Sequence, residues 1–484
     1  MGSEIEVKLD ITPQAAAAIE QAGLLGGAPL VEDLRSIYFD TADHALAAAG
    51  LSLRIRRAGD RRIQTVKASG GSTAGLFARS EWERPVEGDV PILDDTTPIR
   101  AVIGDAADAI APLFEVRIER RLWNVAEGDA AIELVVDRGE VRAGDRVTPI
   151  VEIELELKQG EPLALFAMAR RLDAVAPVRL GVRSKSERGY DLADAAHTAF
   201  KAERIALTGD MTAETAFQHI VRSCIRQFRL NEALLLQGGH PEALHQARVA
   251  LRRMRSAFTV FKPLIGGADA ARLQHDLRSL AATLGEARDL DVLLDRADPG
   301  DLHDRIAAAR EASYARVGEA LDAPWARALM LDVLQWVTAG DWLAIADTAA
   351  DRHRPVREFA IAALDRFRRK VKKDGHDLVH ADDEARHDVR KDAKKLRYAA
   401  EFFRALFERK RERRRYKRFV GALEALQDQL GALNDLASAP AVLDRIGLAG
   451  HADAIGGSGP GKKALVRAAA DAHEDLIDTK RFWR

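Results

Sequence analysis

The sequence has little cysteine and no long apolar run. Cys224 is the single cysteine among 484 residues, which excludes an intramolecular disulfide framework and a thiolate-clustered metal site. No stretch of about 20 uncharged apolar residues occurs, so we expect no transmembrane helix. Charged residues within the first ten positions argue against a secretory signal. These absences predict a cytoplasmic protein with no membrane partner.

The composition is that of a folded chain: 47% of the residues are hydrophobic and 31% are charged. At about 150 residues per domain, the length favours two large domains or three smaller ones. The net charge of −2 hides an asymmetry. Residues 1–200 hold 24 basic and 33 acidic residues, a net of −9, and residues 201–484 hold 49 and 42, a net of +7. Halves of opposite sign predict two units with different partners.

The first 200 residues are typical of an antiparallel β domain with flanking helices. Apolar and polar residues alternate with period two in seven runs, which indicates strands: 3–11, 35–41, 51–59, 61–69, 115–123, 131–139 and 150–158. Helices are predicted near 12–22 and 162–174. We therefore expect an α+β domain over 1–200 and a linker over 201–211.

From residue 212 to 484 the pattern changes to amphipathic helices rich in alanine, leucine and arginine, which predicts an all-α domain. The predicted helices span 212–236, 242–263, 269–296, 301–321, 325–340, 353–374, 384–409, 411–435, 437–447 and 463–478. The segment HQARVALRRMR (245–255) recurs as HDVRKDAKKLR (387–397), and each copy precedes a glycine-containing segment, 284–293 or 430–439. This duplication predicts two related helical bundles, about 212–340 and 353–484.

Charged side chains recur on one face of the predicted strands. In EIEVKL, Glu4, Glu6 and Lys8 share a face, and acidic residues share a face again in IVEIELELK (150–158). Basic residues take the same positions on middle strands, such as Arg54 and Arg56. If the sheet curls with these faces inward, its lumen must hold water, ions or a charged ligand. Carboxylates suit a hard cation and arginines suit phosphate, which together predict a metal-bound phosphorylated compound.

Motifs in the first half of the chain are similar to those of a known family. EIEVK, LRIR, a lysine-bearing strand, EIELE and SKSERGY occur in the order found in the CYTH, or triphosphate tunnel metalloenzyme, family. Residues 1 to about 200 therefore resemble that family. The resemblance implies an eight-stranded antiparallel β tunnel that hydrolyses triphosphate compounds with Mg²⁺ or Mn²⁺.

The resemblance also implies roles for particular residues. The metal ligands are Glu4, Glu6, Glu152 and Glu154, which with Lys8 form the catalytic set. The triphosphate-binding residues are Lys8, Arg54, Arg56, Lys67, Glu81, Arg120, Asp137 and Lys185. Two positions stay open: Glu83 could replace Glu81, and Arg117 or Arg121 could replace Arg120.

The helical repeat places histidine and basic residues within an arc of about 80° on a helix. Its two copies read H-x-x-R-x-x-x-[RK]-[RK]-x-R, and this half of the chain resembles the CHAD domain. The resemblance implies binding of inorganic polyphosphate by the basic surface. The residues implied are His245, Arg248, Arg252, Arg253, Arg255, Arg288, His387, Arg390, Lys391, Lys394, Lys395, Arg397 and Tyr398.

The leading hypothesis is a metal-dependent inorganic triphosphatase whose helical domain binds polyphosphate. One alternative is a polyphosphate-binding protein with little or no turnover. Others are hydrolysis of nucleoside or thiamine triphosphate, and nucleotide cyclisation. Nucleic acid is the weaker partner for the basic helices, because they offer few aromatic side chains for base stacking and the pI is only about 6.7. Nothing in the sequence indicates an oligomeric state.

Overall fold

The computed structural model describes residues 5–68, 76–77, 81–194, 196–449 and 461–484. Glu4, one of the expected metal ligands, lies outside them. The chain divides into a strand unit, Met1–Thr198 with Pro324–Gln335, and a helical unit, Ala199–Ala323 with Trp336–Arg484. The N-terminal antiparallel sheet with helices and the all-helical C-terminal part confirm the predicted fold classes.

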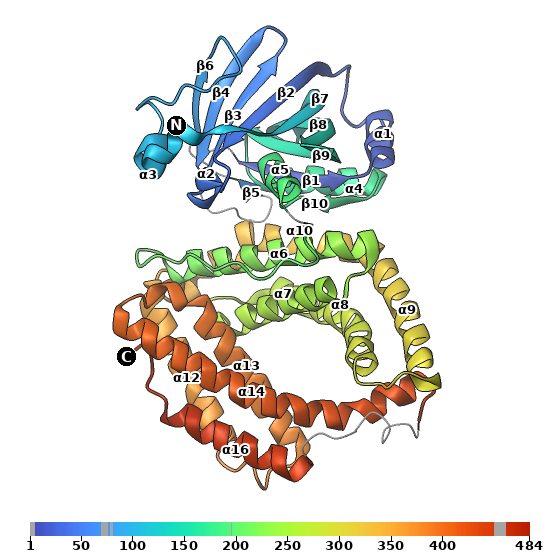
Figure 1. Cartoon of the computed structure of the whole chain (residues 1–484), viewed down its shortest axis with the longest axis vertical. Coiled ribbons are helices and arrows are strands. Elements are labelled where there is room, and N and C mark those ends of the chain that lie inside the picture. The colour runs from blue at the N-terminus through green and yellow to red at the C-terminus, as the bar shows by residue number, and fades with distance from the viewer. Residues whose placement is uncertain (1–4, 69–75, 78–80, 195, 450–460) are drawn as a thin grey trace. The chain divides into compact units, whose positions relative to one another are not determined.

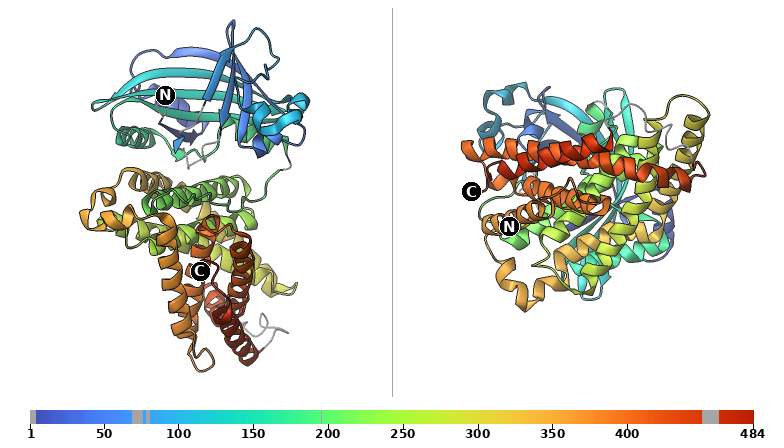
Figure 2. Two further views of the ribbon diagram at one scale, coloured as in Figure 1. Left: turned by 90° about the vertical axis from the view of Figure 1, so that its left-hand side faces the viewer. Right: turned by 90° about the horizontal axis from the view of Figure 1, so that it is seen from below.

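The strand unit is built on one curved antiparallel sheet with the order β10-β1-β9-β8-β7-β2-β3-β4-β6, and β5 pairs with β1 (Figures 1 and 2). The strands are β1 (Glu6–Ile11), β2 (Leu30–Asp40), β3 (Leu51–Ala58), β4 (Arg61–Ala68), β5 (Leu76–Phe77), β6 (Glu81–Pro85), β7 (Ala111–Glu127), β8 (Ala130–Ala143), β9 (Arg146–Gln159) and β10 (Val178–Leu180).

Eight of these strands have five or more residues, as predicted for the sheet, and the described residues add two short ones, β5 and β10. The sequence pattern missed β6. Its segment EWERP is short and ends in proline, and its strand conformation depends on pairing with β4. Alternation alone does not reveal such a strand, because its hydrogen-bonding partner is distant in the sequence.

Short helices cover parts of the sheet. They are α1 (Pro13–Gln21), α2 (Ala45–Ala48), α3 (Ile99–Ile103), α4 (Leu163–Val175) and α5 (Lys185–Ala193), with the 3₁₀ turn η1 (Gly104–Ala109). Helix α4 packs on β1, β7 and β9, and α5 packs on β7, β8 and β9. The sequence analysis missed α5, because its polar segment lacks an apolar repeat.

The helical unit follows the predicted helices closely. They are α6 (Ala213–Gly238), α7 (Pro241–Val260), α8 (Gly267–Leu294), α9 (Asp301–Asp322), α10 (Pro324–Ala339), α11 (Ala349–Arg352), α12 (Val356–Asp374), α13 (Asp383–Phe402), α14 (Lys410–Arg445) and α16 (Lys462–Asp478), with 3₁₀ turns η2 (Asp341–Ala344), η3 (Ala346–Thr348) and η4 (Arg404–Leu406). Helix α10 is shared between the two units.

The two copies of the repeat lie on α7 and α13, which pack against each other. Within each half, consecutive helices pair: α6 with α7 and α7 with α8, then α12 with α13 and α13 with α14 (Figure 1). Arg252 Nε on α7 donates a 2.6 Å hydrogen bond to the hydroxyl of Tyr398 on α13. The repeat therefore brings two equivalent helix faces into contact.

One predicted helix boundary was wrong. We expected separate helices over 411–435 and 437–447, but α14 runs unbroken through both and contains Pro440. A proline inside a helix removes one backbone hydrogen bond. Packing offsets that loss, since Val442 and Leu443 lie in an apolar cluster with Leu290 and Leu293 of α8 and Ile306 of α9.

No single helix in the described part of the chain has the length and apolar character needed to cross a membrane. The helix pair Pro324–Ala344 and Ala346–Arg352 meets both requirements only when taken together, with a bend of 96° between its members.

Candidate active site and basic helix faces

The concave face of the sheet encloses a cavity of about 280 Å³ lined by charged side chains. Strand pairing aligns them in rows across the sheet. Lys8 of β1 lies opposite Glu154 of β9, and Arg120 of β7 lies opposite Asp137 of β8. The lining residues are Glu6, Lys8, Tyr38, Ser52, Arg54, Arg56, Thr65, Lys67, Glu81, Glu83, Arg120, Glu133, Val135, Glu154, Glu156, Ser184, Lys185 and Ser186.

The cavity contains most of the residues expected from the sequence. It resolves one open position, because Arg120 lines it, whereas Arg121 pairs with Glu20 and Glu119 outside it. Arg117 also lies elsewhere and pairs with Glu115. Glu81 and Glu83 both line the cavity: Glu81 pairs with Lys67 at 3.1 Å and Glu83 accepts from the Thr65 hydroxyl at 3.0 Å.

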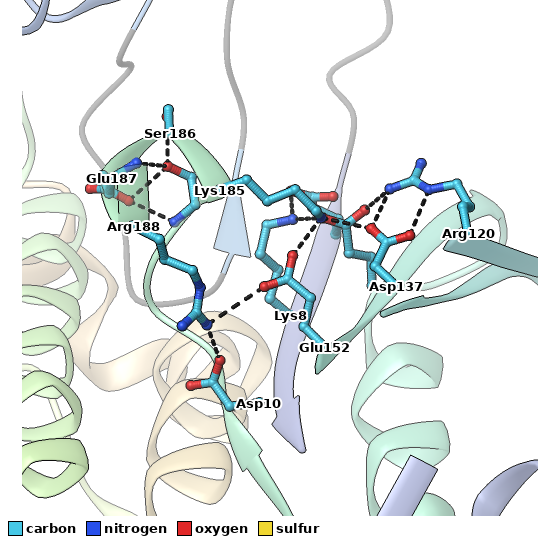
Figure 3. Close-up of polar contacts among 12 residues, drawn as sticks. Lys8, Asp10, Arg120, Asp137, Glu152, Lys185, Ser186, Glu187 and Arg188 are labelled. Carbon is cyan, nitrogen blue, oxygen red and sulfur yellow. Dashed lines mark hydrogen bonds and ion pairs between the residues drawn. The ribbon is translucent and has the colours of Figure 1, made fainter. Parts of the chain in front are cut away.

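Asp137 and Glu152 lie behind the cavity wall, at 0% and 1% exposure. Both contact Lys185 Nζ, at 2.7 Å and 2.5 Å (Figure 3). Glu154 also contacts Lys185 Nζ, at 3.0 Å. One oxygen from each of the three carboxylates fits within 4.8 Å of the others, a spacing that suits a metal ion. The Lys185 ammonium supplies the positive charge at this cluster.

The charge network fixes the ionisation of its members. Burial by itself would raise the pKa of Glu154, but Lys185, Lys8 and Arg120 hold it well below the usual range. Burial would likewise lower the pKa of Lys185, yet Asp137, Glu152 and Glu154 raise it. These groups therefore stay charged at neutral pH.

The wall of the cavity formed by β3 carries positive charge, and its arginines have fewer hydrogen-bond partners than the carboxylate cluster. Arg54 and Arg56 come from β3, and the buried Nε atom of each has no hydrogen-bond partner among the described residues. Burial, followed by repulsion from Arg54 and Arg120, lowers the pKa of Arg56 to about 10. Although burial would raise the pKa of the nearby Tyr38 phenol, the two arginines lower it. Buried donors without acceptors indicate a place for an anion.

Helix α5 carries Lys185 into the site and is held by local contacts. Its N-cap Ser184 forms a capping box with Glu187: the Ser184 hydroxyl accepts from Glu187 N at 3.2 Å, and Glu187 Oε2 accepts from Ser184 N at 2.7 Å. Tyr190 donates from its hydroxyl to the buried Asp40 at 2.7 Å. These contacts set where Lys185 reaches the carboxylates.

Sequence analysis missed several residues of the site. Tyr38, Ser52, Thr65, Glu133, Ser184 and Ser186 line the cavity without having been singled out. Arg188 pairs with Asp10 and with Glu152 at 3.6 Å behind the wall. Glu133 could have been found, because it shares a strand face with Val135 and Asp137. The serines depend on how α5 folds back onto the sheet.

The residues present fit a divalent cation and a triphosphate. Glu6 and Glu154, with Glu152 beside Glu154, offer the carboxylate oxygens that bind Mg²⁺ and Mn²⁺, and Arg54, Arg56 and Lys67 offer donors to phosphate oxygens. Both sets meet at one cavity.

In the helical unit, Arg252 lies at the centre of a basic cluster with Arg248, Arg390, Lys394 and Arg397. Arg252 on α7 repels Arg390 and Lys394 on α13. Burial, followed by Arg252, Arg390 and Arg397, lowers the pKa of Lys394 to about 7. Such crowding of positive charge stores electrostatic repulsion that a bound polyanion would relieve.

Three further residues of the predicted set flank this cluster. His245 lies near Arg288 and Arg252, and burial, followed by these cations, lowers its pKa. Arg255 lies between Arg252 and Arg278. Arg288 also pairs with Asp291 at 3.5 Å.

The structure does not bring the other predicted residues into the basic cluster. Arg253 is only 3% exposed and donates to Gln227 at 2.8 Å. Lys391 pairs with Asp388 at 2.5 Å and Lys395 with Asp392 at 2.9 Å. His387 contacts Asn434 at 2.7 Å. Tyr398 is the exception, because its buried hydroxyl accepts from Arg252 Nε and therefore lies in the cluster.

Each half of the chain matches the model of a known domain family. The CYTH domain model matches residues 2–190 and the CHAD domain model matches residues 219–444. The chain carries a CYTH domain followed by a CHAD domain. The CHAD domain from the plant Ricinus communis is a similar solved structure, with a TM-score of 0.50 and 28% identity over 59% of this chain and 98% of that one. The helical unit thus has the CHAD fold.

Two relatives are similar in sequence. An inorganic triphosphatase of Haemophilus influenzae is 31% identical over 201 residues, which are 39% of this chain and 55% of that protein. The uncharacterized protein Rv2226 of Mycobacterium tuberculosis is 26% identical over 416 residues, or 76% of this chain and 75% of that protein. The chain therefore spans about half the length of the triphosphatase that it matches.

Proposed function

We propose that the CYTH domain hydrolyses inorganic triphosphate to diphosphate and phosphate with Mg²⁺ or Mn²⁺. The observation that carries this proposal is the cavity in which a carboxylate wall faces Arg54 and Arg56, whose buried Nε atoms have no hydrogen-bond partner in the described part of the chain. The Haemophilus influenzae relative, described as an inorganic triphosphatase, supports the same chemistry.

The side chains divide the work by charge. Arg54, Arg56 and Lys67 bind the phosphate oxygens and offset the charge that grows on the leaving diphosphate as the bridging P–O bond breaks. Glu6 and Glu154, with Glu152 beside Glu154, would hold the metal, which when bound polarises a phosphoryl oxygen. A carboxylate of the acidic wall orients the water whose oxygen forms the new P–O bond. No nucleophilic side chain is needed.

Inorganic triphosphate fits the cavity better than a nucleotide does. Tyr38 is the one aromatic residue among the lining residues, and it is 4% exposed and stacked on Phe114. The described lining residues therefore offer no exposed aromatic surface to a base or a thiazole ring. Nucleoside and thiamine triphosphates remain the alternative substrates, and a polyphosphate-binding role without turnover remains the alternative function.

The test is release of phosphate from tripolyphosphate by the intact chain with Mg²⁺ or Mn²⁺. We expect activity that a chelator abolishes and that Glu6→Gln lowers at least about 100-fold, the usual loss when a group acting on the transition state is removed. Glu119→Gln is the matched control, because it makes the same change on β7 outside the cavity, where Glu119 pairs with Arg121. No release by the folded protein with either metal would refute the proposal.

We propose further that the CHAD domain binds inorganic polyphosphate through the basic cluster at Arg252, Arg390 and Lys394. The repulsion stored among these side chains supports this, since no carboxylate of the described residues pairs with Lys394 within ion-pair distance. Nucleic acid is the competing ligand. A cytoplasmic location stays a prediction.

A further inference from the structure

A second group of arginines lies at the start of α14, apart from the repeat. Arg411, Arg414, Arg415 and Arg418 occupy positions i, i+3, i+4 and i+7 and therefore share one face of the helix. Together with Asp478, Thr479 and Lys480, which end and follow α16, they line a cavity of about 430 Å³. We call these four side chains the arginine stripe.

The fold does not use most of this charge. Arg411, Arg414 and Arg418 are exposed, and no carboxylate of the described residues lies within ion-pair distance of them. Arg415 alone is tied down, by donating to the main-chain carbonyls of Arg481 and Arg484. Glu412, the acidic residue of this turn, accepts a hydrogen bond from Arg409 N and forms an ion pair with Arg357.

The position of the stripe carries an energetic cost. Backbone N–H groups give a helix N-terminus a partial positive charge, which repels cations in the first turns. The first nine residues of α14, KRERRRYKR, hold seven basic residues and one acidic residue. Of the stripe only Arg411 lies in that first turn, but the three exposed arginines together present positive charge that no described carboxylate neutralises, which suits a ligand of opposite charge.

The stripe is separate from the basic cluster on α7 and α13. The segment that carries Lys394 meets α14 at Gln427, whose Nε2 donates to the carbonyl of Ala393 at 3.2 Å. Gln427 lies nine residues beyond Arg418, or about 14 Å along a straight helix. The last basic residue of the repeat, Arg397, is paired with Glu401 at 3.5 Å rather than directed to the stripe.

We propose that the arginine stripe is a second binding site for a linear condensed phosphate. From Arg411 to Arg418 it spans about 10 Å of helix, so neighbouring phosphoryl groups of one chain can each meet a guanidinium, which binds phosphate oxygens in pairs. None of the described residues that line the cavity is aromatic. The stripe thus lacks the platforms on which single-stranded nucleic acids stack their bases.

The test is titration of the intact chain with short linear polyphosphate. Because this ligand is also the one proposed for the basic cluster, each variant is made both alone and in an Arg252→Gln/Lys394→Gln background. The stripe variant is Arg411→Gln/Arg414→Gln/Arg418→Gln. The matched control, Lys410→Gln/Arg413→Gln/Lys417→Gln, removes the same charge from exposed positions of the same turns that do not line the cavity.

In the Arg252→Gln/Lys394→Gln background, we expect the stripe variant to lower the remaining affinity at least about tenfold and the control to leave it within about twofold. Loss of three phosphate contacts should also flatten the dependence of log K on log salt by about 2. Loss on the stripe variant with no effect of Arg252→Gln/Lys394→Gln would support the stripe and refute the basic cluster instead.

Three outcomes would overturn the proposal. One is an equal loss of affinity in the stripe and control variants, because that would mean diffuse attraction by net charge. Another is unchanged binding in the stripe variant whose helical content matches that of the parent. The third is binding of single-stranded DNA to the stripe as tight as that of polyphosphate, which would assign the surface to nucleic acid.

Discussion

Arg54 and Arg56 are half-buried charged residues that lower the stability of the fold. Each side chain lines the cavity from β3, and its buried Nε atom has no hydrogen-bond partner among the residues that the structure describes. A buried charge without its partner destabilises a folded protein. We therefore infer that both side chains are positioned to bind an anionic substrate. Such a site lowers the stability of the protein in favour of its activity.

We predict that Arg56→Gln lowers kcat/KM for tripolyphosphate about 100-fold without lowering the melting temperature. The catalytic loss follows from removing a donor that acts on the developing charge. Stability holds because repulsion from Arg54 and Arg120 disappears with the guanidinium. Steady-state kinetics and thermal unfolding measure the two effects.

Arg57→Gln is the control for this pair of measurements. Arg57 is the next residue on β3, is exposed, and donates its Nε to the carbonyl of Gly59 at 3.0 Å. Its substitution should change neither quantity appreciably. A drop in melting temperature for Arg56→Gln larger than that for Arg57→Gln would contradict the assignment of Arg56 to substrate rather than to the fold.

We predict that the proposed binding of polyphosphate depends on pH through Lys394. Its pKa is lowered to about 7 by burial and by Arg252, Arg390 and Arg397, and a bound polyanion would raise it again. Binding then takes up a proton above pH 7, so affinity should fall about fivefold between pH 7 and pH 8 from this group alone. Calorimetric titration across that range checks the fall.

The conservative variant Lys394→Arg separates titration from charge. Arginine stays protonated throughout this range, so the variant should bind at pH 8 as it does at pH 7. The same lowered pKa predicts that folding stability rises with pH from about 7 to about 10, since the unfolded lysine holds its proton where the folded one does not. An identical pH profile for Lys394→Arg and the parent would refute this assignment.

At the scale of elements, α5 shows how a helix end positions a reactive group. The Ser184–Glu187 capping box fixes the first turn of α5, and Lys185 is the residue that follows the cap. Since Lys185 contacts three carboxylates, a small shift of this turn would change the charge network of the whole site. Loss of the Ser184 cap is therefore expected to lower the rate of hydrolysis.

We predict that Ser184→Ala destabilises the protein by about 1 kcal/mol and lowers kcat/KM about tenfold. Thr12→Ala is a matched control, because Thr12 caps α1 in the same domain with a 3.1 Å bond from Ala15 N but does not line the cavity. It should cost similar stability and no activity. Ser184→Thr, which keeps the cap, should restore the rate. Denaturant unfolding and steady-state kinetics provide the readouts.

At the scale of the whole molecule, the two proposed activities reside in separate units of the chain. We predict that Arg252→Gln/Lys394→Gln lowers polyphosphate affinity at least about tenfold and leaves tripolyphosphate hydrolysis unchanged. Glu6→Gln should do the reverse, because its side chain lies in the cavity of the sheet. Polyphosphate affinity and the rate of tripolyphosphate hydrolysis, both measured on each variant, test whether the two sites act independently. A change in both quantities for either variant would mean that the two sites are coupled.

Much of this molecule followed from periodicity in the sequence. Period-two alternation was enough to place Glu6 and Lys8, or Arg54 and Arg56, on one strand face, because successive side chains of a strand point to opposite sides. The duplicated motif was enough to predict two equivalent helices, since its histidine and arginines recur at helical spacing. Both are local properties of the backbone.

Tertiary structure decided which faces meet. The register between β7 and β8 sets Arg120 opposite Asp137. Strand period separates Arg120 from Arg117 and Arg121, but the curl of the sheet decides which of the two faces lines the cavity. The fold of α5 places Ser184 in the cavity, and packing around α7 buries Arg253 away from the basic cluster that Arg252 joins. Sequence period determines on which side of its own element a residue lies, whereas its partners come from elements far along the chain and are set by long-range packing.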